Sequence, residues 1–98
     1  MTPEIIVRPR AEHDIACAFG RYEDRLPGLG LRFVEEFEST LERVRILPRK
    51  HQVVHKIIRR ALMRRFAYGV YFVVSETQIV VLGVLRLTEN PEHVAKLL

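Results

Sequence analysis

The chain has 98 residues, of which 48% are hydrophobic, and this fits one globular domain (1–98) rather than a disordered chain. Its single cysteine, Cys17, excludes an internal disulfide. With no signal peptide or membrane-spanning run in the sequence, we expect a protein of the reducing cytoplasm with no membrane partner. The apolar neighbours of Cys17 predict a buried, unreactive thiol.

The net charge of +4 is distributed in blocks. Residues 1–42 carry five Arg and nine acids, a net −4, whereas residues 43–75 carry nine Lys or Arg and no acid. Such a block favours an anionic partner, either a nucleic acid or an acidic protein segment. The alternative is a surface that the acidic first part balances in the folded protein.

The first half of the sequence predicts one strand and two helices. Residues 4–8 ("EIIVR") form a short apolar run that Pro9 ends. The predicted helix that follows has an apolar stripe, and "LPGLG" (26–30) separates it from a second helix that Pro48 ends. The stripes are Ile15, Phe19, Tyr22 and Leu26, then Val34, Phe37, Leu41 and Val44. Two helices joined by a short turn predict a helical hairpin.

The second half predicts three strands and a short helical tail at 90–98. Residues 68–75 and 79–87 are apolar on both alternating faces, which is typical of central strands. The stretch from Ile58 to Phe66 fits a strand or a helix by periodicity. We interpret it as a strand, because Phe66 and Ala67 suffice as the bend into residue 68. The predicted fold class is α+β, with a helical hairpin packed on a small antiparallel β-sheet in the order strand-helix-helix-strand-strand-strand.

This order resembles the RelE/ParE superfamily of toxins from type II toxin–antitoxin systems. The matching stretches are "GLGLRFVEEFESTLERVRILP" (28–48), "IIRRALMRRFAYGVYFVV" (57–74) and "IVVLGVLRL" (79–87), so the likeness covers nearly the whole chain. Ala67 stands where the family commonly has proline. The resemblance implies a functional groove at the arginine-rich strand and a cognate antitoxin as partner.

The superfamily divides by mechanism. RelE-like members resemble ribosome-dependent mRNA endonucleases that use Lys and Arg with a late Arg and Tyr, whereas ParE-like members are associated with poisoning of DNA gyrase and have largely lost that set. Here "RLTENPEHV" (86–94) leaves only Arg86 and His93 as weak catalytic candidates, and no tyrosine follows Tyr71. We therefore place the chain on the ParE-like branch, with a ParD-like antitoxin, DNA gyrase as the suspected target, and nucleic acid met only indirectly. The alternatives are a RelE-like endoribonuclease, or an inactive member that only pairs with an antitoxin.

The candidate residues for binding the target or the antitoxin combine the basic strand with the second helix. They are Arg59, Arg60, Arg64, Arg65, Arg86, Phe33, Phe37 and Leu41. We expect the basic strand to form an unpaired sheet edge that a partner chain extends. We expect no cofactor and no metal, because His51 and His55 have no third ligand nearby in the sequence.

Overall fold

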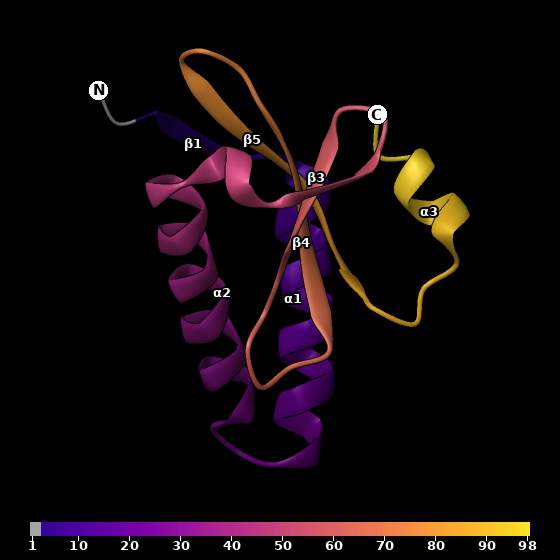
Figure 1. Cartoon of the computed structure of the whole chain (residues 1–98). Helices are drawn as coiled ribbons and strands as arrows, with labels where there is room; N and C mark the ends of the chain where they lie inside the picture. Colours follow the sequence, from indigo (N-terminus) through magenta and orange to yellow (C-terminus); the bar gives the residue numbers. More distant parts are fainter. Residues whose placement is uncertain (1–2) are drawn as a thin grey trace.

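The computed structural model describes residues 3–98, which form an α+β fold (Figure 1). Its elements in chain order are β1 (Glu4–Val7), α1 (Pro9–Arg25), α2 (Leu29–Ile46), the 3-10 turn η1 (Pro48–Lys50), β2 (Gln52–His55), β3 (Ile58–Leu62), β4 (Tyr68–Val74), β5 (Gln78–Arg86) and α3 (Pro91–Ala95). The predicted α+β class and the helical hairpin are confirmed, and β2 is a strand that the prediction lacked.

The sheet is mixed, in the order β1-β5-β4-β3-β2. β2, β3, β4 and β5 pair antiparallel, but β1 runs parallel to β5, with Ile5 opposite Ile79. The prediction of a wholly antiparallel sheet is therefore wrong at this edge. Two adjacent strands are forced antiparallel only where a tight hairpin joins them, and β1 and β5 are separated by the rest of the chain.

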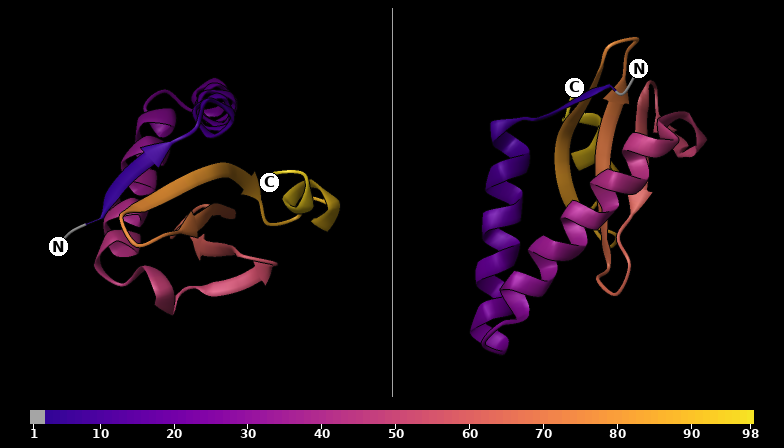
Figure 2. Two further views of the ribbon diagram at one scale, coloured as in Figure 1. Left: turned by 90° about the horizontal axis from the view of Figure 1, so that it is seen from above. Right: turned by 90° about the vertical axis from the view of Figure 1, so that its left-hand side faces the viewer.

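The two long helices cover one face of the sheet (Figure 2). Phe33 and Val44 of α2 are fully buried against Val70 and Phe72 of β4 in the larger core cluster. The alternation predicted for residues 68–74 is confirmed, because Tyr68, Val70 and Phe72 face this cluster while Tyr71 faces the opposite one.

The buried stripe of α1 differs from the predicted one. Ala11 and Ala18 are fully buried, with Ile15 and Tyr22 packed beside them, whereas the side chains of Phe19 and Leu26 are 37% and 55% exposed. Both stripes have the same helical spacing. Because Ala11 and Ala18 have small side chains, this face of α1 can approach the rest of the core closely. The large apolar residues of α1 therefore indicated the wrong buried face.

The α1–α2 connection is stabilised by polar groups. Gly28 has a φ of 92°, in the left-handed region that glycine adopts without strain. The Glu23 carboxylate accepts hydrogen bonds from the N–H groups of Gly28 and Gly30, at 3.0 to 3.1 Å. This carboxylate satisfies N–H groups that the start of α2 leaves unpaired.

The opposite face of the sheet carries a smaller cluster that α3 partly covers. Leu97 packs there with Ile58, Tyr71, Leu82 and Leu85. Within residues 3–98, no helix combines the length and the hydropathy needed to cross a membrane.

Candidate target-binding and antitoxin-binding surface

The arginine-rich segment is divided between a strand and a loop. β3 ends at Leu62, so Arg64 and Arg65 lie in the loop 63–67 that leads to β4. β3 also pairs with β2 on one side and with β4 on the other. The expectation that the basic strand forms an unpaired edge is therefore wrong, because the short strand β2 occupies that edge.

The two arginines of β3 differ in their surroundings. The Arg59 guanidinium donates hydrogen bonds to the backbone carbonyls of Arg49 and His51, at 2.9 and 2.7 Å. These bonds tie η1 to the sheet and give Arg59 a structural role. Arg60 is part-exposed, and its aliphatic chain packs closely over Gly69, about 3.0 Å from where a β-carbon would stand.

The loop 63–67 presents its arginines to solvent. Arg64 and Arg65 are both exposed, and Arg65 has a φ of 69°. The Glu36 carboxylate accepts a hydrogen bond from the Arg64 N–H at 2.9 Å, and the Met63 N–H donates to the Tyr68 carbonyl. The backbone of the loop is thus held to α2 and β4, while the two guanidinium groups remain available to a partner.

A cleft of about 840 Å³ lies between this loop and the helical hairpin. It is lined by Tyr22, Leu29, Arg32, Glu35, Glu36, Arg65, Phe66 and Ala67. The rings of Tyr22 and Phe66 meet edge to face at 5.0 Å between centroids. Burial raises the pKa of Tyr22 above its ordinary value, so the phenol is neutral at pH 7. The cleft therefore combines an aromatic wall with exposed charges of both signs.

The predicted residues of α2 lie mostly inside the molecule. Phe33 is fully buried and Phe37 is 6% exposed, and both belong to the core over the sheet, while Leu41 is partly buried beside them. Near its turn, the hairpin instead presents Phe19, Leu26 and Leu31 to solvent, with Leu31 58% exposed. This surface was not predicted from the sequence, because the helical spacing placed Phe19 and Leu26 in the buried stripe.

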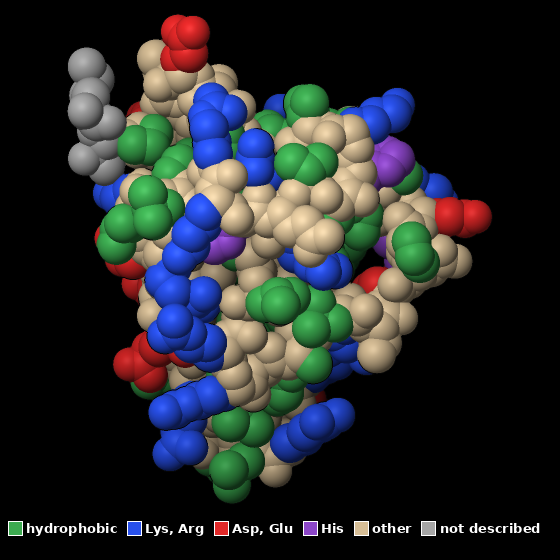
Figure 3. Space-filling view, in the orientation of Figure 1, with side chains coloured by type: hydrophobic (Ala, Val, Ile, Leu, Met, Phe, Trp, Pro, Cys, Tyr) green, Lys and Arg blue, Asp and Glu red, His purple; other side chains and the backbone are tan. Residues whose placement is uncertain are grey.

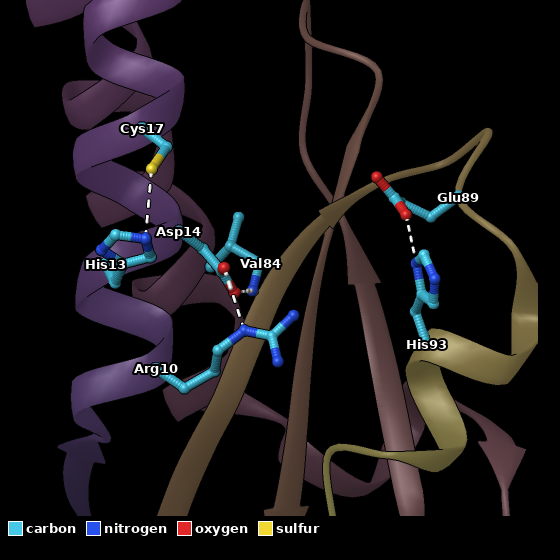
Figure 4. Close-up of polar contacts among 7 residues, drawn as sticks. All are labelled: Arg10, His13, Asp14, Cys17, Val84, Glu89 and His93. Carbon is cyan, nitrogen blue, oxygen red and sulfur yellow. Dashed lines mark hydrogen bonds and ion pairs between the residues drawn. The ribbon is translucent and has the colours of Figure 1, made fainter.

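The two weak catalytic candidates share one carboxylate near the C-terminal end of the chain. The Glu89 carboxylate pairs with His93 Nδ1 and lies 4.0 Å from Arg86 Nη2. Figure 4 shows His93 and Glu89 facing each other across from Arg10, His13, Asp14 and Cys17 of α1. A second cleft, of about 310 Å³, separates the two groups.

Cys17 is exposed, so the prediction of a buried thiol is wrong. Its Sγ lies 3.4 Å from His13 Nε2 on the solvent side of α1 (Figure 4). The four residues around Cys17 in the sequence are apolar, but α1 turns Ala18 inward and leaves Ala16, Cys17 and Phe19 exposed. Within residues 3–98, no three His, Cys, Asp or Glu side chains are grouped so that they could hold a metal ion.

Basic side chains form a band on the α2 side of the molecule (Figure 3). α2 and η1 contribute Arg32, Arg43, Arg45, Arg49 and Lys50. Four of these five fall within the acid-free block 43–75, so charge patterning signalled the band. The predicted binding arginines nevertheless all lie at position 59 or later.

No family model and no curated protein matches this sequence. Among solved structures, the chain is similar to one described as "Chromosomal ParDE TA system from P. aeruginosa", with a TM-score of 0.78 and 15% sequence identity. The similarity covers 87% of this chain and 96% of the other. The predicted ParE-like fold is thus confirmed, and the protein shares its fold with a chain of a ParDE toxin–antitoxin system.

Proposed function

We propose that this protein is the toxin of a ParE-like type II toxin–antitoxin pair. In this proposal it stops growth by binding DNA gyrase, and a ParD-like antitoxin neutralises it. The observation that carries the proposal is the fold shared over 96% of a chain from a ParDE system. Identity of 15% leaves the target to be tested directly.

The cleft beside the loop 63–67 is the proposed contact surface. Arg64 and Arg65 are exposed. Each guanidinium can donate two parallel hydrogen bonds to a carboxylate or phosphate, which a lysine ammonium group cannot do. The aromatic wall of Tyr22 and Phe66 offers apolar area next to these charges. Aromatic and arginine side chains of this kind commonly dominate the binding energy of protein interfaces.

The antitoxin is proposed to cover the hairpin and then the cleft. An apolar helix of the partner would pack on Phe19, Leu26 and Leu31, the exposed apolar residues near the hairpin turn. Acidic residues that follow it would then reach Arg64 and Arg65. Phe33 and Phe37 shape this surface from below rather than contacting the partner.

The arrangement of Glu89 favours a binding toxin over the nuclease alternative. RNA cleavage needs a cation on the phosphate and a group that transfers a proton to or from the reacting oxygen. Arg86 and His93 both pair with Glu89, and this carboxylate would repel a phosphate brought to either of them.

The test compares two reactions with the purified full chain. DNA supercoiling by gyrase should be inhibited, and mRNA on translating ribosomes should stay intact. Cleavage of ribosome-bound mRNA would instead establish the nuclease alternative. Expression without growth arrest, together with tight antitoxin binding, would identify an inactive member that only pairs with an antitoxin.

A further inference from the structure

A basic cleft of about 320 Å³ lies where the end of β3 meets α2 and the start of β2. It is lined by Arg43, Lys50, His51, Gln52, Arg60 and Leu62, and none of these residues is acidic. Three lining side chains, Arg43, Lys50 and Arg60, are positively charged at pH 7. The cleft is separate from the one beside the loop 63–67, with which it shares no lining residue.

The local backbone explains why this cleft exists. β2 begins at Gln52, which pairs with Arg60, so the last residues of β3 have no strand beside them on this side. Arg43 of α2 reaches the open edge, and its Nη2 donates to the Leu62 carbonyl at 3.3 Å and to Thr40 Oγ1 at 3.0 Å. The side chain of Arg43 is therefore fixed in place by the fold.

Two nitrogens of the cleft residues have no acceptor. Among the side chains of residues 3–98, Arg43 Nε and His51 Nε2 are the buried nitrogen or oxygen atoms that have no hydrogen-bond partner. Buried polar atoms are rarely left unpaired, and a missing ion or water is a common reason. Both atoms belong to residues that line this cleft.

The positive charges of the cleft are only partly neutralised by the protein's own acids. Burial lowers the pKa of His51. A hydrogen bond with the Arg43 backbone raises it, and the nearby cations Lys50, Arg43 and Arg59 lower it further. One cation of the cleft has an acidic partner, since the Glu36 carboxylate lies 3.8 Å from Arg43 Nη2. An anion in the cleft would reduce the repulsion among these groups.

We propose that this cleft binds a phosphate group. A phosphate presents several acceptor oxygens and up to two negative charges, which match three cations and a histidine better than the single charge of one carboxylate does. The first contacts would come from exposed Lys50 and part-exposed Arg60, with Arg43 and His51 behind them. The phosphate comes either from a small molecule or from a nucleic-acid backbone that follows the basic band of Figure 3. This site does not depend on the proposed toxin function.

The test uses sulfate as the first probe, because it stays a dianion across the pH range of interest. Sulfate is titrated into the full chain at low ionic strength, and amide chemical shifts are followed by NMR. We expect saturating shifts at Lys50, His51 and Gln52, and affinity about tenfold weaker in Lys50→Glu, which reverses a charge of the cleft. Lys96→Glu makes the same charge change outside the cleft and should bind as the wild type does.

The pH dependence of sulfate binding gives a second readout, through the protonation of His51. Wild-type affinity for sulfate should rise as the pH falls from about 7.5 to 5.5, because the bound anion favours protonated His51. The groups that face His51 are Lys50, Arg43, Arg59 and the ring of Phe72, so an added anion is the main source of negative charge. His51→Phe keeps an aromatic ring against Phe72 and should remove most of this pH dependence.

The source of the phosphate is distinguished with a short single-stranded oligonucleotide. If the source is a backbone, the oligonucleotide should bind more tightly than sulfate, and Lys50→Glu should lower its log–log salt slope by about 1. Equal affinity for sulfate and oligonucleotide would identify a small phosphate compound. Polyglutamate, titrated in the same way, serves as a carboxylate probe. The proposal is overturned if sulfate shifts no amide of the cleft, or if Lys50→Glu binds sulfate as tightly as Lys96→Glu does. It is also overturned if polyglutamate shifts these amides and neither sulfate nor the oligonucleotide does.

Discussion

The Asp14 carboxylate of α1 accepts a hydrogen bond from the Val84 N–H of β5 at 2.9 Å (Figure 4). β1 pairs with β5 only as far as Val81, so the edge of β5 beyond that point has no neighbouring strand. Arg43 of α2 makes the corresponding contact at the other side of the sheet, where its guanidinium donates a hydrogen bond to the Leu62 carbonyl. A charged side chain from a helix thus satisfies the backbone where each edge strand is too short to do so.

Replacing Asp14 with alanine should therefore destabilise the fold. The change leaves the Val84 N–H without its partner, at a cost of about 1–3 kcal/mol. Urea unfolding of the purified chain measures the loss. Arg10→Ala is the control, because Arg10 contacts the same carboxylate at 3.1 Å from an exposed position and should cost less than about 1 kcal/mol. Equal losses in the two variants would show that the ion pair, and not the backbone contact, gives Asp14 its effect.

The arginines of the segment 59–65 should separate into structural and functional residues. Arg59→Ala removes two charge-assisted bonds to backbone carbonyls and should cost about 1.5–3 kcal/mol of stability. Arg64→Ala removes an exposed side chain and should change stability by less than about 0.5 kcal/mol.

The substitutions that reduce growth arrest most should not be the ones that reduce stability most. Arg64→Ala should relieve the arrest although the chain remains folded, if the exposed loop contacts the target. Lys96→Ala, which removes an exposed charge elsewhere, should leave toxicity unchanged. Full toxicity of Arg64→Ala and Arg65→Ala would remove the loop from the proposed contact surface.

A side chain at Gly83 should displace the side chain of Leu97, which follows α3. A β-carbon at this position would stand 2.8 Å from Leu97 Cδ2 and 3.2 Å from Asp14 Oδ2. Gly83→Ala should therefore loosen the packing of Leu97 and cost about 1–3 kcal/mol, with faster hydrogen exchange in residues 91–97. Gly20→Ala is the matched control, since its β-carbon would meet no atom within 4 Å, and it should stabilise α1 by about 0.5–1 kcal/mol.

Stability should fall on acidification because of His51. Its pKa in the folded chain is lowered by burial, so the unfolded chain binds the proton more readily. The folded state is then favoured above the unfolded pKa of about 6.5 and loses this advantage as the pH falls below it. In His51→Phe, the drop in the thermal midpoint below about pH 6.5 should be smaller than in the wild type. An unchanged drop would assign the pH dependence to other groups.

The sequence predicted the order of the main elements because helical stripes and long apolar strands are local signals. It did not predict β2, because "QVVH" is four residues long and half-exposed, and its pairing with β3 is a tertiary contact. The charge block 43–75 correctly marked a basic surface. It did not distinguish Arg59, which binds carbonyls of its own chain, from Arg64, which faces solvent, because periodicity carries no information about where a strand ends.

Binding of the antitoxin should protect the hairpin and the loop 63–67 from hydrogen exchange. β3 already lies between β2 and β4 in the free chain as far as Arg60, so new protection there should be small. The loop and the edge strand β2 have open backbone groups, and the hairpin exposes Phe19, Leu26 and Leu31. A partner that folds as it binds needs to bury on the order of 1,000–3,000 Å², which requires contact with both regions. Exchange measured for the free and the bound chain should therefore slow near the α1–α2 turn and at residues 63–67. Protection restricted to residues 90–98 would instead place the antitoxin on α3 and contradict this model.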